Sequence, residues 1–371
     1  MSSADSVAVP APRERRSRRE LVDAVVRVRE LGLIVVLALL IGVTAAFEPR
    51  FIEADSLRNL VRNATILGLL AVGQTLVLVT RNLDLSVGSV LGLSAFMTGD
   101  VLASNPGLPI PIVFALGILL GTGAGIVNGT LVAYGRIPAL VATLGTLWIF
   151  RGLAFVWTGG SQVNAENLPG GFLSIGTGTV AGVPTIALFT IVVLVAVGFG
   201  LRNYRAGREL YAIGSNPDAA RLAGIRHQRR VFGAFIASGS LAELAGVLFT
   251  ARFATVDATA GTGLELQVIA AAVIGGVAIF GGSGSVWGAA LGAVVLTTIT
   301  SALIVLQVPA FWQQAVVGAL LLTAIALDRF INVRVTERLR RRSARRTEAV
   351  AEAVGPPEPS PAGASGEGGS S

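Results

Sequence analysis

The chain has 371 residues, of which 53% are hydrophobic and only 14% are charged. An ordinary soluble domain carries about 25% charged residues, so this composition excludes a soluble globular protein and indicates a polytopic membrane protein. The sequence has no cysteine, which excludes disulfides, thiolate metal sites and cysteine nucleophiles, and its formal net charge of +7 comes from 29 basic residues that are all arginine.

In the N-terminal segment 1–30, the first 19 residues are rich in Ser, Pro and Arg, and 20–30 is predicted to be a helix that runs into the membrane. The apolar run 31–47 follows. A cleaved signal peptide would also end in small residues such as Ala46, but Glu48 comes soon after it and the run is long for a signal core. We therefore expect the first membrane span here.

Nine further apolar segments have the roughly 17 to 25 residues that are needed to cross about 30 Å of hydrocarbon. The fold class predicted from them is all-α, a polytopic helical bundle of about ten transmembrane helices that fills a transmembrane domain over 31–328. A glycine-rich segment among them can still be broken or re-entrant. The nine lie at 61–80, 85–104, 110–134, 137–158, 183–201, 231–251, 264–281, 285–306 and 311–327.

The arginines predict the orientation of these spans. If the N-terminus is cytoplasmic, 24 of the 29 arginines fall on the cytoplasmic side, where membrane proteins concentrate positive charge. Both termini are then cytoplasmic, and the basic segment and polar tail over 329–371 is expected to be disordered after Ala344. The cytoplasmic groups are 13–29, Arg81, Arg136, 202–230 and 329–346, and the outer arginines are Arg50, Arg58, Arg62, Arg151 and Arg252.

The sizeable polar interruption at 202–230 carries the signals of one short helix. Asn216 can cap a helix, Pro217 suits the first helical position, and Gly224 can end the helix. The sequence therefore predicts a surface helix from Pro217 to Ala223.

Two glycine series predict close helix packing. Glycines recur every fourth residue from Gly117 to Gly129, and Gly284, Gly288 and Gly292 repeat the spacing. Tight packing is the simpler interpretation, and helices that slide along smooth seams during transport are the alternative. The outer segment 161–178 is too polar for a span and is either a docking surface or a flexible connector.

No catalytic constellation stands out. The sequence has no HExxH motif and no nucleophile elbow, and its single histidine, His227, is expected to be a solvated loop residue. Asp84 is expected to pair with Arg81 and Asn82 in a structural turn, and Asp100 to lie at the outer interface. The scattered polar residues in or near spans serve either as hydrogen-bonding glue between helices or as ligands of a polyol: Asn63, Gln74, Asn128, Glu243, Glu265 and Gln267.

Six strings, in this order and spacing, resemble the permease subunits of bacterial monosaccharide ABC importers between about Leu57 and Asp328. The TRNLDLSVGS form and the GSG string are most similar to the rhamnose and autoinducer-2 import permeases, whereas ribose and xylose permeases more often have two glycines at Arg81 and Asn82. The strings are TRNLDLSVGSVLGLSAF, VNGTLVAYGRIPALVATLGTLWIFRGL, GRELYAIGSNPDAARLAGI, GTGLELQVIAAAVIGG, FGGSGSVWGAALGA and VPAFWQQAVVGALLL.

The resemblance implies a non-catalytic membrane subunit that works with a cytoplasmic ATPase, an extracytoplasmic sugar-binding protein and a second permease subunit, identical or related. It implies that the loop 202–230 receives the ATPase, and our coupling assignment is Gly207, Arg208, Glu209, Asn216, Pro217, Ala219, Ala220 and Gly224. The assigned substrate path is Asn63, Gln74, Asn128, Glu265 and Gln267. No GxxxxGK[ST] string occurs, so this subunit is not expected to bind or hydrolyse ATP. The assignment includes no other cofactor and no metal.

Three alternatives remain at this point. An ion-coupled secondary transporter would need carboxylates near the membrane midplane, and none is confidently central in the sequence. A membrane-embedded enzyme would need a catalytic constellation. An ABC permease for branched-chain amino acids keeps the architecture and changes the cargo, and the GRELYAIGSNPDAARLAGI string favours the sugar instead.

Overall fold

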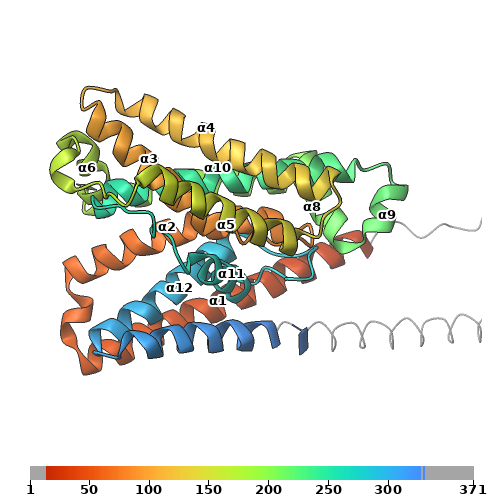
Figure 1. Cartoon of the computed structure of the whole chain (residues 1–371). Helices are drawn as coiled ribbons and strands as arrows, with labels where there is room; N and C mark the ends of the chain where they lie inside the picture. Colours follow the sequence, from red (N-terminus) through yellow and green to blue (C-terminus); the bar gives the residue numbers. More distant parts are fainter. Residues whose placement is uncertain (1–13, 327–328, 331–371) are drawn as a thin grey trace, which may run out of the picture. The chain divides into compact units, whose positions relative to one another are not determined.

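The computed structural model describes residues 14–326 and 329–330 (Figure 1). The described chain is helical apart from a small antiparallel hairpin. Residues up to Ile325 belong to one compact unit, and a second begins at Ala326. Most of the predicted basic segment and tail at 329–371 lies outside the described residues.

Short helices and turns join the long helices in chain order. The first half comprises α1 (Glu14–Phe47), η1 (Pro49–Ile52), α2 (Ala54–Leu78), α3 (Val87–Ser104), α4 (Ile110–Gly129), the π-helical turn η2 (Thr130–Tyr134) and α5 (Ala139–Thr158). The second half comprises η3 (Ala165–Asn167), α6 (Gly170–Thr177), β1 (Thr179–Val180), β2 (Val183–Pro184), α7 (Thr185–Asn203), α8 (Arg205–Ser215), α9 (Pro217–Leu222), α10 (His227–Phe253), α11 (Leu264–Ile274) and α12 (Val286–Val305). An unlabelled helix, Ala310–Ala326, follows.

Eight described helices are long and apolar enough to cross a membrane, where the sequence predicted ten. They match the first seven predicted spans and the ninth. The helix predicted over 20–30 is confirmed as part of α1. The predicted span 264–281 is too long, because α11 stops at Ile274 and Gly276 takes φ +98°, a conformation that glycine adopts readily. The tenth segment, Ala310–Ala326, is shorter than a typical span.

Helix α2 lies at the centre of the unit. Its second half, LGLLAVGQTLVL, is buried at every position, as expected for a helix that is apolar all round. It packs against α7, α10, α11 and α12. In contrast, α1 is peripheral: its apolar part is almost entirely exposed within the chain, and its main contacts are with α12 and η1.

The predicted glycine packing is confirmed where α4 meets α10. A Cβ atom at Gly125 would lie 2.5 Å from the Phe235 carbonyl oxygen, and one at Gly121 would lie 2.6 Å from the Glu243 Cβ. The second glycine series does the same where α12 meets α11, because a Cβ at Gly292 would lie 3.0 Å from the Gly275 Cα. Both seams therefore place backbone against backbone.

Replacing Gly125 by leucine is expected to lower the melting temperature and the yield of folded protein, since overpacking a close seam costs about 1–3 kcal/mol or more. Gly123→Leu is the matched control, because a Cβ at Gly123 has no neighbour within 4 Å. Thermal unfolding in detergent measures the difference. Loss of transport by a Gly125→Leu protein that melts like the wild type would instead support sliding.

The outer segment 161–178 is folded, so its interpretation as a flexible connector is wrong. Val163, Leu168 and Phe172 are buried, and Val163 forms a β-bridge with Val256. Helix α6 packs on α10 and lies at the opposite end of the bundle from α9 (Figure 1). Whether this surface docks a partner stays a prediction.

Candidate functional site

Helix α9 has the capped structure that the sequence predicts. The Asn216 side-chain oxygen accepts hydrogen bonds from the backbone N–H groups of Asp218 (3.2 Å) and Ala219 (3.1 Å). Pro217 occupies the first helical position, and Gly224 follows the end of the helix with φ +75°. The observed helix ends at Leu222, one residue earlier than predicted, and it stands at the end of the bundle (Figure 1).

The outer face of α9 carries an apolar side chain that the sequence analysis missed. Leu222 is 92% exposed, the highest exposure among the large hydrophobic residues that the structure describes. Ala219 is also on the surface, whereas Ala220 is only 4% exposed and lies under the helix. The available signal was one leucine in a short helix that is otherwise polar or small. Leu222 therefore presents apolar surface that a partner would remove from water on binding.

Helix α8 is held to α10 by an ion pair and to α7 by close packing. Glu209 is buried and accepts hydrogen bonds from Arg205 (2.6 Å) and Arg230 (2.5 Å), so two cations of the same chain already occupy its carboxylate. Gly207 lets α8 pass close to α7, because a Cβ there would lie 2.5 Å from the Leu201 carbonyl oxygen. Arg208 is exposed and donates to the Asn203 carbonyl oxygen at 2.7 Å.

The Arg81 side chain joins the α2–α3 turn to the end of α8. Its Nε donates to the Gly214 carbonyl oxygen (2.5 Å) and its Nη2 to the Ser215 carbonyl oxygen (2.9 Å). The predicted pairing of Asp84 with Arg81 and Asn82 is therefore wrong. The backbone of Arg81 has φ +66°, which turns its side chain toward α8 and away from Asp84.

The turn at 275–285 is a second support for α8. Tyr211 donates its hydroxyl to the Gly284 carbonyl oxygen (3.1 Å), and burial raises the pKa of this phenol to about 12, so it stays a donor at physiological pH. The Gly282 N–H donates to the Val79 carbonyl oxygen (3.0 Å). The α2–α3 turn and the turn at 275–285 thus contact each other and both contact α8. Helix α9 is connected to both turns through α8.

Asp84 instead lies in a buried polar cluster. Its Oδ1 accepts hydrogen bonds from the Ser86 N–H (3.0 Å) and hydroxyl (2.7 Å), and Ser238 on α10 donates to its Oδ2 at 3.4 Å. Asn128 on α4 donates to the Ser86 Oγ (2.7 Å) and accepts from Thr146 on α5 (2.6 Å). The cluster therefore links the α2–α3 turn to three spans.

Gln74 completes this cluster from α2. With its amide in the orientation that satisfies both ends, its nitrogen donates to the Asp84 carbonyl oxygen (3.1 Å) and its oxygen accepts from the Asp84 N–H (3.2 Å). Gln74 and Asn128 are thus brought together, as hydrogen-bonding glue in this conformation. Asn63, Glu265 and Gln267 are half-buried, and no hydrogen bond between described residues joins them to the cluster.

Two charged residues within predicted spans, Arg151 and Glu243, are buried in the fold. Arg151 on α5 is 8% exposed and donates to the carbonyl oxygens of Ala258 (2.8 Å) and Ala260 (2.6 Å), which pins the loop before α11. Glu243 is fully buried in α10 beside the α4 glycines. A carboxylate thus lies inside the bundle at Glu243, and its burial is revealed only by packing in three dimensions.

The pH response of α8 can be predicted from Glu209. Hydrogen bonds from Arg230 and then Arg205 lower the pKa of this carboxyl below its ordinary value of 4.5. A depressed folded-state pKa stabilises the protein above pH 4.5, and this stabilisation is lost as the pH falls through the lowered value.

Thermal melting between pH 7 and pH 3 should therefore fall more steeply for the wild type than for Glu209→Gln. The matched control is Glu166→Gln, which changes an exposed carboxylate in the outer segment. Parallel curves for the wild type and Glu209→Gln would contradict the ion-pair account.

His227 is not a solvated loop residue. It begins α10, is half-buried, and has a buried Nδ1 with no hydrogen-bond partner in the described part of the chain. It lines a cavity beside α9. Sequence reasoning failed here because a run of arginines around a histidine resembles a solvated segment, and the fold is needed to show the hollow.

Comparisons with known proteins agree with this architecture. Residues 56–325 match the family model described as branched-chain amino acid transport system / permease component. The autoinducer 2 import system permease protein LsrC of Salmonella choleraesuis is 38% identical over 331 residues, covering 89% of this chain and 92% of that protein. The Escherichia coli protein of the same name is 38% identical over 313 residues, covering 84% of this chain and 90% of that protein. No solved structure matches.

The matched region holds every described span except α1, together with α8 and α9. The function it defines is transport across the cell membrane by a multi-pass subunit that performs no catalysis and binds no cofactor itself. The chain belongs to the family of branched-chain amino acid transport system permease components, as the membrane subunit of an ABC import system.

Proposed function

We propose that this permease imports a furanosyl or related sugar, such as autoinducer-2 or rhamnose, and that a cytoplasmic ATPase drives it through α9. The structure of α9 supports its role as the contact for the ATPase: the helix is capped at both ends, lies at the end of the bundle, and exposes Leu222 almost completely. A short capped helix with an exposed leucine can transmit movement from a partner that buries this side chain.

The proposed topology places α9 and both termini in the cytoplasm. The arginine distribution supports it, because 24 of the 29 arginines then lie inside. We assign segment 1–30 and segment 329–371 to the cytoplasm and 31–328 to the transmembrane domain, with the coupling loop at 202–230. The short helices α11 and Ala310–Ala326 would complete ten membrane segments, with α11 re-entrant because it is too short to span and its residues Val268 to Val273 are buried in protein.

Force would reach the membrane helices through the supports of α8. A push on α9 acts on α8, and α8 is tied to the α2–α3 turn by Arg81, to the 275–285 turn by Tyr211 and to α10 by Glu209. These contacts join α9 to the central helix and to the helix that packs along α4. Movement of this set would pass the bundle between inward-facing and outward-facing states.

The coupling residues take distinct roles in this proposal. Asn216, Pro217 and Gly224 shape α9, and Ala219 with Leu222 forms the contact surface. Ala220, Gly207 and Glu209 seat the helices, while exposed Arg208 is available to the partner. For the substrate path we keep Asn63, Gln74, Asn128, Glu265 and Gln267, with Gln74 and Asn128 acting after the central cluster opens.

The cargo assignment rests on the relatives at 38% identity, whose names state autoinducer 2 import, whereas the family description states branched-chain amino acids. An extracytoplasmic binding protein and a second permease subunit, identical or related, would complete the importer. Proteoliposomes containing the permease, its cognate ATPase and its binding protein should take up labelled autoinducer-2 or rhamnose only with ATP. Uptake of leucine instead would overturn the sugar assignment, and uptake without nucleotide would overturn the ABC mechanism.

A further inference from the structure

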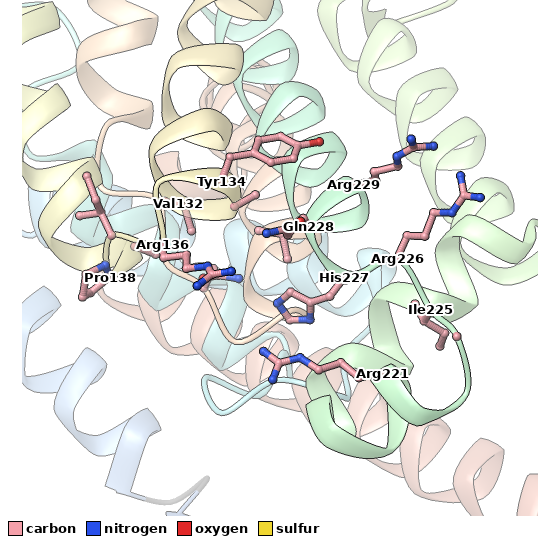
Figure 2. A pocket seen from close by; sticks show the side chains of 16 residues that line it. Val132, Tyr134, Arg136, Pro138, Arg221, Ile225, Arg226, His227, Gln228 and Arg229 are labelled. Atoms are coloured by element: carbon pink, nitrogen blue, oxygen red, sulfur yellow. The ribbon is translucent and has the colours of Figure 1, made fainter.

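A large basic cavity lies beside α9 and has no role in the mechanism proposed above. Its volume is about 1090 Å³, and its walls come from the η2–α5 connection, α9 and the start of α10. Figure 2 shows the guanidinium groups of Arg136 and Arg221 near the His227 ring, with Gln228 beside them. Arg226 and Arg229 also line it, but their side chains point away from these groups in Figure 2 and also line a neighbouring pocket that contains Glu209.

The positive charge in this cavity is not balanced within the described chain. No carboxylate is among the described residues that line it. Arg221 has one acidic neighbour, Asp218 at 3.8 Å, and both side chains are largely exposed. Arg136, Arg226 and Arg229 form no ion pair with any described residue, and the buried His227 Nδ1 has no hydrogen-bond partner there. Such a group of like charges favours an anion in its midst.

The backbone around the cavity adds to this preference. Helix α10 begins at His227 without a side-chain cap; the His227 N–H donates to the Ile225 carbonyl oxygen (2.8 Å), which leaves the N–H groups of Gln228 and Arg229 and the positive end of the helix dipole for an anion. On the opposite wall, the π-helical turn η2 is followed by Arg136 at φ +56°, an unusual conformation that orients its side chain.

We propose that this cavity binds a phosphate ester, with Arg136, Arg221 and His227 as the groups that hold the phosphate. Guanidinium forks match phosphate oxygens with paired hydrogen bonds, and two arginines from different elements can grip one phosphate from two sides. The volume exceeds what a bare phosphate needs and leaves room for the organic part of an ester. Soluble phosphomonoesters and the phosphodiester headgroups of anionic lipids share this chemistry.

A bound phosphate would tie three elements together. Arg221 belongs to α9, His227 to α10 and Arg136 to the connection that leads into α5. The α9 helix would then be anchored to α5 as well as to α8. This inference does not depend on which solute the permease carries, because no residue of the central polar cluster lines the cavity. Asn82, which lines it, lies beside the cluster in the chain.

The single histidine of the chain permits a direct test on the wild-type protein. The full chain, purified with a tag that lacks histidine and placed in neutral-lipid nanodiscs, is treated with diethyl pyrocarbonate, and modification of His227 is followed by mass spectrometry. Glucose 6-phosphate should slow the modification about twofold or more if it occupies half or more of the sites. Glucose at the same concentration should have no effect.

Variants locate the site. Arg136→Gln and Arg221→Gln should each raise the glucose 6-phosphate concentration that gives half-maximal protection about tenfold or more, since a hydrogen bond to a charged group contributes about 1.5–3 kcal/mol. Arg202→Gln is the matched control, because it removes an exposed arginine that does not line the cavity. Size-exclusion elution checks that each variant is folded, and the wild-type protection experiment stands even if a variant is not.

A second arm distinguishes the two sources of phosphate. Nanodiscs that contain phosphatidylglycerol should protect His227 without any added ester if the ligand is a lipid headgroup. Protection by either source, lost in the cavity variants and kept in Arg202→Gln, supports the site. The inference is overturned if neither source protects His227, if Arg202→Gln weakens protection equally, or if only the partner ATPase protects it, which would mean that protein carboxylates fill the cavity.

Discussion

Replacing Leu222 by glutamine is expected to abolish most ATP-driven uptake while the membrane helices stay folded. The side chain is 92% exposed, so nothing within the chain depends on it, and glutamine forms helices well. Burying a leucine in a partner's pocket contributes about 1.5–3 kcal/mol, and burying an amide there adds a penalty. The ATPase should therefore bind the variant about thirtyfold more weakly.

Binding of the purified ATPase to permease nanodiscs measures this effect directly. Leu222→Met is the matched control, because it keeps a large apolar side chain and should bind as the wild type does. Ala220→Trp should lift α9 from its seat, and Gly224→Val should strain its end at φ +75°, so both are expected to lose transport and ATPase stimulation. The solute should still bind the soluble receptor. Normal ATPase coupling in these variants would contradict the assignment of α9.

Arg81→Gln is expected to separate ATP hydrolysis from transport. The substitution leaves α9 and Leu222 in place, so the ATPase can still dock, but it removes the two hydrogen bonds from Arg81 to Gly214 and Ser215. Each such bond to a charged donor contributes about 1.5–3 kcal/mol, so uptake should fall about tenfold or more. Hydrolysis should persist, because the break lies between the docking helix and the bundle.

The measurement is the ratio of solute imported to ATP hydrolysed in proteoliposomes. Arg202→Gln serves as the control, since it removes the same charge from an exposed position at the end of α7. Glutamine and arginine tolerate the φ of +66° at position 81 to a similar extent, so backbone strain does not confuse the comparison. An unchanged ratio in Arg81→Gln would show that α8 transmits force by another contact.

Local signals in the sequence predicted local structure well. The α9 helix follows from Asn216, Pro217 and Gly224, because capping depends only on residues within one turn. The glycine seam of α4 follows from its four-residue spacing in the same way. Seven long spans after α1 were placed to within several residues, since hydrocarbon thickness fixes their length.

Contacts between distant segments could not be predicted. Asp84 and Arg81 are three residues apart, and proximity favoured an ion pair, yet Arg81 reaches α8 and Asp84 bonds Ser86 and Ser238. The left-handed backbone at Arg81 determines which way its side chain points, and an arginine in the sequence does not indicate that conformation. The cavity around His227 was missed for a related reason, because one of its walls, the η2–α5 connection, is far in the chain from α9 and α10.

The peripheral position of α1 bears on how the protein is made. Its main helical partner is α12, which the ribosome synthesises more than two hundred residues later. During that interval α1 has only lipid around it, so it must enter the bilayer and remain there without help from the rest of the bundle. Its apolar part is the most hydrophobic of the eight candidate spans, which suits this solitary stage. Helix α1 must therefore be stable in the bilayer by itself, whereas α2, which contains polar residues, is buried among other helices.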